Sequence, residues 1–156
     1  MTDSSGVSMS PENAAKLDLA RQFIQSIPHS HALGMLLEEI GGGKAVISMP
    51  WDERLVGDPR TGVISGGAIS ALMDTCCGAA VMSHPAAPAG TATIDLRIDY
   101  MRAATPRQRI TARAEVYHIT RSVAFLRATA IDEEAGLPVA TATGAFTVER
   151  VKGGAK

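Results

Sequence analysis

The chain has 156 residues, of which 46% are hydrophobic, 20% charged and 4% aromatic. That length suits one domain that buries most of its unfolded surface without disulfide or metal staples. Fifteen Lys and Arg against sixteen Asp and Glu give a net charge of -1. This balance argues against a nucleic-acid partner, and the scarcity of aromatic residues argues against a platform for stacked bases.

Targeting and redox signals are also missing. Residues 1–10 are small and polar, so we expect a disordered tail rather than a secretory signal. No run of about eighteen apolar residues predicts a transmembrane helix. Cys76 and Cys77 are the only cysteines and are adjacent, which rules out an ordinary structural disulfide between them, and no Cys/His spacing resembles a zinc site. We therefore expect a reduced, cytoplasmic protein with no membrane partner and no cofactor.

The first half of the chain is predicted to begin with a helix. Ser10 can cap it and Pro11 fits its first turn. Its apolar residues recur at helical spacing; they are Leu17, Ala20, Phe23, Ile24 and Ile27. The elements expected here are a helix over 11–27, a connector at 31–34, a hairpin of strands 35–40 and 44–49, a loop over 50–62 and a long central helix over 66–83.

In the second half the apolar period changes to two, which indicates half-buried strands. Between residues 93 and 101, for example, Ile94, Leu96, Ile98 and Tyr100 alternate with polar residues. Four strands are expected as a meander, over 93–101, 110–119, 123–132 and 138–149. Strands grouped after a helix and joined by short turns predict an antiparallel sheet with a helix on one face. The expected fold class is α+β, with one domain over residues 11–150.

The central helix carries most of the chemical information. It is apolar on nearly every side, which indicates a helix wrapped by a sheet. Asp74 is its only charged residue, and a buried carboxylate is costly unless it is paired or used. We therefore expect Asp74 to belong to a site. The alternative is a carboxylate on a solvent-facing stripe, or one paired with an arginine for stability.

Gly66 and Gly67 open this helix. Their N–H groups lie among the unpaired donors at the positive end of the helix dipole, and glycine lets a ligand approach the backbone closely. They could form an oxyanion site for a polarised carbonyl. The alternative is plain capping, with Ser65 as the N-cap residue and the glycines placed for tight packing.

Two segments together resemble a known family. Residues 62–74 begin Gly-Val-Ile-Ser-Gly-Gly, continue with small apolar residues and end at Asp74. This resembles the signature of the PaaI-like acyl-CoA thioesterases of the hotdog superfamily, which is Gly-x-x-His-Gly-Gly with an acidic residue nine positions after the His. The stretch 93–104 is similar to the family's third strand. The resemblance covers about residues 33–148.

The resemblance implies a hotdog fold, in which a curved antiparallel sheet wraps a long central helix, here with an extra N-terminal helix. It also implies homodimers, often paired into tetramers as dimers of dimers, that hydrolyse acyl-CoA thioesters at the dimer interface. Carried over, Asp74 is the nucleophile or the general base for water, and the Gly66 N–H polarises the thioester carbonyl. Thr93 takes the place of a strand hydroxyl that helps to hold the water. Substrate contacts are expected from Ser65, Gly67, Arg121 and Ser122.

Two positions depart from the family pattern. Ser65 replaces the family His, and the upstream Asn or Gln aligns near Pro59, beside Asp58. These departures favour an alternative, a non-catalytic acyl-CoA-binding or dimerisation domain of the same fold. A hotdog hydratase ranks last, because no Asp is followed by a His at the required short spacing. Arg121 could bind a CoA phosphate or be a solvated turn residue.

The spacing on the helix adds a geometric constraint. Asp74 lies about two turns, or roughly 10–12 Å, beyond Gly66, which is too far for both to act on one carbonyl. We therefore expect Asp74 of one chain to meet Gly66 of a partner. The histidines at 29 and 31 are expected on the surface or at the rim of the pocket. The N-terminal helix over 11–27 is expected to pack on the core; the alternatives are that it covers an edge or the acyl pocket.

Overall fold

A computed structural model describes residues 10–134 and 136–151. Apart from Ser10, the tail predicted over residues 1–10 lies outside the described residues. The expected domain range of 11–150 stays a prediction.

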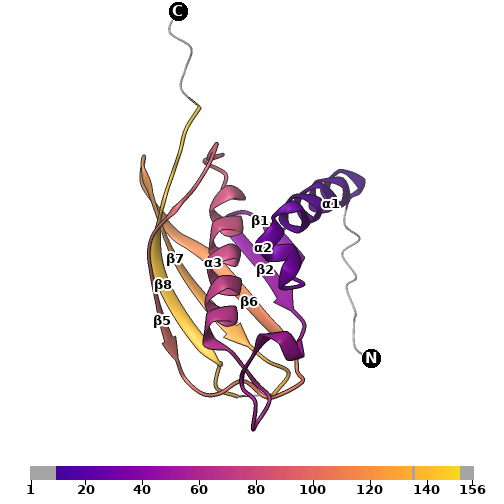
Figure 1. The fold of residues 1–156 in the computed structure, drawn as a ribbon. Coiled ribbons are helices and arrows are strands. Elements are labelled where there is room, and N and C mark those ends of the chain that lie inside the picture. The colour runs from indigo at the N-terminus through magenta and orange to yellow at the C-terminus, as the bar shows by residue number, and fades with distance from the viewer. Residues whose placement is uncertain (1–9, 135, 152–156) are drawn as a thin grey trace, which may run out of the picture.

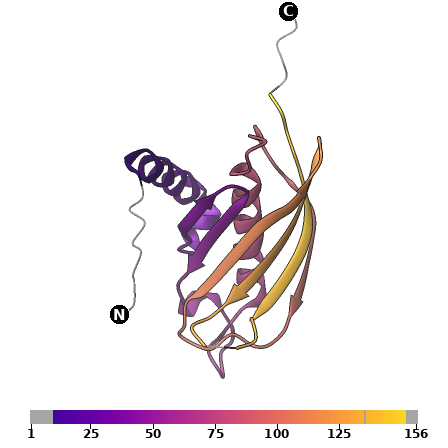
Figure 2. The same cartoon turned by 180° about the vertical axis from the view of Figure 1, so that it is seen from behind.

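The architecture is a curved antiparallel sheet around one long helix, α3 (Figures 1 and 2). The sheet has the strand order β1-β2-β6-β7-β8-β5. Its strands are β1 (Leu36–Gly41), β2 (Lys44–Met49), β5 (Thr93–Tyr100), β6 (Ile110–Ile119), β7 (Val123–Ile131) and β8 (Ala140–Thr147). The helix α3 (Gly66–Met82) packs chiefly on β2, β6 and β7. The predicted α+β fold class, with a long helix wrapped by a sheet, is confirmed.

The prediction of a four-stranded meander is wrong. Only β6, β7 and β8 follow one another as neighbours, while β5 lies at the far edge and pairs with β8. Between β5 and β6 the chain crosses over residues 101–109, a connection longer than a hairpin turn. The period-two pattern fixes which face of a strand is apolar but not which strand lies beside it, so it could not reveal this order.

Helix α1 (Pro11–Ser26) covers the opposite edge of the sheet, at β1. The side chain of Ser10 caps it by accepting a hydrogen bond from Asn13 N at 3.3 Å. Ile24 is buried against the core, and Arg21 Nε donates to the β1 carbonyl of Leu37 at 2.8 Å. Phe23 departs from the core packing expected for this helix, because its side chain is 65% exposed.

Two short segments differ from the expected connectors. Pro28 ends α1 but also begins a second helix, α2 (Pro28–Ala32), because proline fits a first helical turn. The predicted loop over 50–62 contains a 3-10 turn (Glu53–Leu55) and a strand β3 (Val56–Asp58), which pairs with β4 (Val63–Ile64). This small hairpin leads directly into the first turn of α3.

The core lies between α3 and the sheet. The buried residues of α3 are Ala68, Ile69, Leu72, Met73, Cys76, Cys77, Ala79, Ala80 and Val81. Burial raises the pKa of the Cys76 thiol to about 12 and raises the pKa of Cys77 as well, so both cysteines act as packing residues. No helix in the described ranges is long and apolar enough to cross a membrane.

Candidate active site

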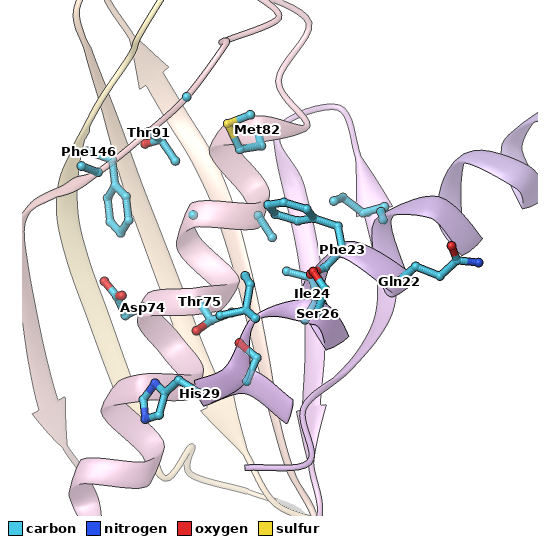
Figure 3. A pocket seen from close by; sticks show the side chains of 18 of the residues that line it. Gln22, Phe23, Ile24, Ser26, His29, Asp74, Thr75, Met82, Thr91 and Phe146 are labelled. Atoms are coloured by element: carbon cyan, nitrogen blue, oxygen red, sulfur yellow. The ribbon is translucent and has the colours of Figure 1, made fainter. Parts of the chain in front are cut away.

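A pocket of about 1170 Å³ lies over the outer side of α3. Helices α1 and α2 form one wall, and the segment 89–93 forms the other together with Phe146 of β8 (Figure 3). Its floor comes from the side of α3 that the sheet does not cover, and consists of Asp74, Thr75, Gly78, Ala79 and Met82. Asp74, the only charged residue of α3, therefore faces a cavity.

Asp74 and Thr93 meet on this pocket, although they are far apart in the chain. The Thr93 Oγ1 hydroxyl donates to Asp74 Oδ1 at 2.6 Å. Asp74 is half-buried rather than fully buried, because its side of α3 is open to the pocket. No arginine or lysine pairs with its carboxylate in the part of the chain that the structure describes. The structure therefore does not support the alternative in which Asp74 is paired with an arginine.

A β-bulge aims Thr93 at the helix. In the β5–β8 ladder Thr93 pairs with Phe146 and Asp95 with Ala145, so the register shifts by one residue between them. Beyond this shift Leu96 pairs with Gly144. The extra residue places Thr93 on the same face as Leu96, although strict alternation would put them on opposite faces. Ile94 is the residue displaced from the pattern, and it is 56% exposed.

The N-terminus of α3 forms a second group of polar atoms. Ser65 Oγ accepts from Gly67 N at 3.3 Å, as the capping alternative predicted. The Gly66 carbonyl accepts from Tyr100 Oη at 2.7 Å and from Ser70 Oγ at 3.1 Å. Within the described residues the Gly66 N–H has no hydrogen-bond acceptor. The exposed Gly66 N–H is therefore available to a ligand at the positive end of the helix dipole.

Sequence reasoning missed Tyr100 and Ser70. Their hydroxyl oxygens lie 2.6 Å apart and together fix the orientation of the first peptide of α3. Tyr100 was expected only as part of the apolar face of its strand. A phenol within that alternating pattern gives no sign that its hydroxyl reaches another element, so the pattern alone could not identify it.

The remaining predicted site residues do not join the Asp74–Thr93 pair within one chain. Ser65, Gly66 and Gly67 lie at the N-terminal end of α3, outside the pocket lining. Arg121 and Ser122 are exposed in the β6–β7 turn and also lie outside the lining. His29 of α2 does line the pocket, which fits the rim position considered for it.

The position of the expected upstream amide is occupied differently. Pro59 has no side-chain donor, and the carboxylate of Asp58 accepts from Arg60 N at 3.0 Å. Hydrogen bonds from Arg60 lower the pKa of Asp58. Among the described residues no group of three or more His, Cys, Asp or Glu side chains is arranged to hold a metal ion.

Comparisons with known proteins agree with this architecture. The family model of the thioesterase superfamily matches residues 61–139. The medium/long-chain acyl-CoA thioesterase YigI of Escherichia coli is 28% identical over 153 residues, covering 90% of this chain and 97% of YigI. A solved structure from Pseudomonas aeruginosa has a TM-score of 0.74 at 36% identity, covering 84% of this chain and 97% of that one.

The E. coli PaaI protein, from the phenylacetic acid degradation operon, shares the fold. Its TM-score is 0.75 at 20% identity, over 88% of this chain and 94% of that protein. The predicted hotdog fold is therefore confirmed. The chain belongs to the thioesterase superfamily, as a PaaI-like hotdog protein.

Proposed function

We propose that this protein hydrolyses acyl-CoA thioesters to the free acid and CoA, with Asp74 as the general base or nucleophile. The observation that carries the proposal is the Asp74–Thr93 hydrogen bond, which joins the floor and one wall of a large pocket. The printed name of the E. coli relative, a medium/long-chain acyl-CoA thioesterase, supports acyl-CoA as the substrate class. The pocket supports a sizeable acyl group, because roughly 300–1,000 Å³ already holds a drug-sized ligand.

Thr93 gives the two oxygens of Asp74 different roles. Its hydroxyl occupies Oδ1, which leaves Oδ2 to take a proton from water. The water oxygen attacks the thioester carbonyl carbon, Asp74 accepts the proton, and the C–S bond breaks as the CoA thiolate leaves and is protonated. In the nucleophilic version, Asp74 attacks the same carbon and water then hydrolyses the resulting anhydride. Both versions need the carbonyl oxygen to be stabilised as it becomes negative.

The Gly66 N–H is the proposed donor to that oxygen, and it comes from a second subunit. Gly66 lies eight residues before Asp74 on the same helix, or about 12 Å along its axis, so one chain cannot place both on one carbonyl. In a symmetric dimer each helix would supply Asp74 to one site and Gly66 to the other. The Tyr100 hydroxyl supports this role, because it holds the Gly66 carbonyl and so fixes the adjacent peptide.

The free edge of the sheet supports a homodimer built through β5. Helix α1 covers the β1 edge, whereas the described residues leave β5 unpaired on its outer side. An uncovered edge strand is a template for pairing with another chain. On and next to β5, Ile94, Tyr100 and Met101 are 56%, 48% and 46% exposed. We expect pairing of β5 with its copy, and a dimer of dimers beyond it.

The residues that we propose to contact CoA are those expected from the sequence. Ser65 and Gly67 flank the oxyanion donor, and Arg121 and Ser122 would bind CoA phosphate from the β6–β7 turn. Their place outside the pocket lining is consistent with a nucleotide that stays at the surface while the acyl group enters. We expect this activity in the cytoplasm and without a cofactor.

A second candidate function is a non-catalytic acyl-CoA-binding domain. The observation that favours it is the upstream position, where Pro59 offers no donor and Asp58 is engaged by Arg60. In this alternative nothing beyond Thr93 would orient an attacking water. Asp74 would then serve binding only.

The test is thiol release from short, medium, long and aryl acyl-CoAs, with Asp74→Asn beside the native protein. Asn keeps the shape of the side chain but cannot act as a base, so kcat should fall about 10²-fold or more. Glu133→Gln is the matched control, because Glu133 is an exposed carboxylate in the β7–β8 connection, outside the pocket lining and not on β5. If the native protein releases no thiol but binds acyl-CoA, the binding-domain function replaces the thioesterase function.

A further inference from the structure

We infer that helix α1, through Phe23 and Leu19, forms the wall that holds the acyl chain and sets the chain length that the protein prefers. This rests on the proposed function only in taking the ligand to be an acyl-CoA. Family membership does not supply it, since the family-model match begins at residue 61, well after this helix.

The first observation is the exposure of large apolar side chains around one cavity. Leu19 is 70% exposed, Phe23 65% and Met82 42%, and all three line the pocket. Leu19 and Phe23 lie on α1 and Met82 lies on α3. Figure 3 shows Met82 across the pocket from Phe23. Scattered exposed apolar residues are ordinary, but a group that surrounds one cavity marks a ligand groove.

The second observation is that α1 is held in place by its other side. Ile24 is buried in the core, and Arg21 Nε anchors the helix to the Leu37 carbonyl. Leu19 and Phe23 are four residues apart, so they project from one face of the helix. That face finds no core partner in the described chain and borders the pocket instead. It is thus a fixed apolar surface that an apolar ligand could cover.

The third observation is the direction from the reacting group to this surface. From Asp74 the pocket floor continues along α3 through the small residues Gly78 and Ala79 to Met82. Eight residues of helix span about 12 Å. An extended chain of roughly ten carbons covers this distance, because its zigzag advances about 1.25 Å per C–C bond. Figure 3 shows the Phe23 ring directed toward α3 on the Met82 side of Asp74. A butyryl group would stop short of it, whereas a dodecanoyl group would lie against it.

Phe23 should therefore act on chain-length preference and not on chemistry. Each methylene removed from water contributes about a fourfold factor in affinity. Phe23→Ala should lower kcat/KM about 10- to 50-fold for dodecanoyl-CoA and less than twofold for butyryl-CoA. Leu19→Ala should act in the same direction with a smaller effect. Because both side chains are exposed, neither change should impair folding.

The experiment measures kcat/KM for butyryl-, octanoyl- and dodecanoyl-CoA with the native protein and the variants. Gln25→Ala is the matched control, because Gln25 is exposed on the same helix but outside the pocket lining. In parallel, calorimetry measures Kd for S-butyl-CoA and S-dodecyl-CoA, thioethers that cannot be hydrolysed. The expected result is a selective loss for the longer chain in both assays.

The binding assay keeps this inference separate from the proposed function. If no thioester is hydrolysed but Phe23→Ala still weakens only S-dodecyl-CoA, the acyl wall stands and the thioesterase proposal fails. Equal effects of Phe23→Ala at every chain length, or no effect at any, would overturn the inference. A changed oligomeric state in gel filtration with an unaltered chain-length profile would also overturn it, and would assign this face of α1 to an interface.

Discussion

The bulge that aims Thr93 depends on a glycine in the neighbouring strand. A Cβ added to Gly144 would lie 2.6 Å from the Asp95 carbonyl oxygen and 2.9 Å from Leu96 Cδ1. The first contact is with backbone, so it cannot be relieved by a side-chain rotation. Gly144→Ala must therefore push β5 away from β8 at the register shift, or remove the bulge.

The magnitude follows from opposing effects. Alanine would normally stabilise a strand by about 0.5–1 kcal/mol relative to glycine, but overpacking costs about 1–3 kcal/mol. We expect Gly144→Ala to lower the free energy of unfolding by about 1–2 kcal/mol. It should also displace the Thr93 hydroxyl from Asp74, and a displacement of about 1 Å can cost 10²-fold in rate. Activity should thus fall by at least tenfold, similar to the loss in Thr93→Val.

The assays are urea unfolding and thiol release from octanoyl-CoA. Thr143→Ala is the control, since Thr143 is the neighbouring, exposed residue of β8. The double variant Gly144→Ala with Thr93→Val should be no less active than Thr93→Val alone, because both changes remove the same interaction. A Gly144→Ala protein that is destabilised but fully active would refute the link between the bulge and the site.

Three further predictions concern the framework. Asp132 accepts two hydrogen bonds at 2.7 Å from Arg102. These bonds hold the pKa of Asp132 below its usual range, against the opposing effect of burial. The stabilisation of the fold by this ion pair is therefore present above about pH 4 and is lost as the pH falls through the lower pKa of the folded state. Asp132→Ala should lower the free energy of unfolding by about 3 kcal/mol at pH 7, and urea titrations should show a smaller difference at pH 3; an equal difference at both would contradict the assignment. Tyr100→Phe should lower the free energy of unfolding by about 1 kcal/mol, because the hydrogen bond to the Gly66 carbonyl is lost. It should also lower kcat more than it changes KM. An unchanged kcat would show that catalysis does not depend on the orientation of Gly66 by Tyr100. Because burial raises the pKa of Cys76 to about 12, iodoacetamide at pH 8 should label it only after unfolding, and rapid labelling of the native protein, measured by mass spectrometry, would show that the core opens.

Most helices and strands could be predicted from the sequence, but the order in which the strands pair could not. The central helix, the first hairpin and the four later strands were predicted because each produces a local apolar period. The position of β5 beside β8 was not, because pairing depends on where the chain goes between Met101 and Arg109. The short β3–β4 hairpin was missed for the opposite reason, since strands of two or three residues are too short to show a period.

The site was predictable where its residues share one helix. Gly66 and Asp74 fall within a single motif, so their spacing and their separation follow from helix geometry alone. Thr93 was placed only through a resemblance. The residue lies on the wrong side of a strictly alternating strand, and the bulge that turns it toward Asp74 is set by Gly144, fifty-one positions later. For the helix that carries Phe23 the sequence left core packing and the acyl pocket as alternatives, because an apolar residue at helical spacing fits a core and a ligand pocket equally well.

The same helix geometry explains why the proposed chemistry needs two chains. A separation fixed by a loop can be adjusted by a change in that loop, but the distance between Gly66 and Asp74 is set by two turns of a buried helix. Moving Asp74 along α3 would turn its side chain to another face. An N–H further along α3 would be hydrogen-bonded within the helix, and shortening the helix would open the core. The remaining solution is a second copy of α3 brought alongside. The open edge at β5, which carries both Thr93 and Tyr100, is where that copy would bind, so the strand that aims at the carboxylate and fixes the oxyanion donor would also join the two half-sites.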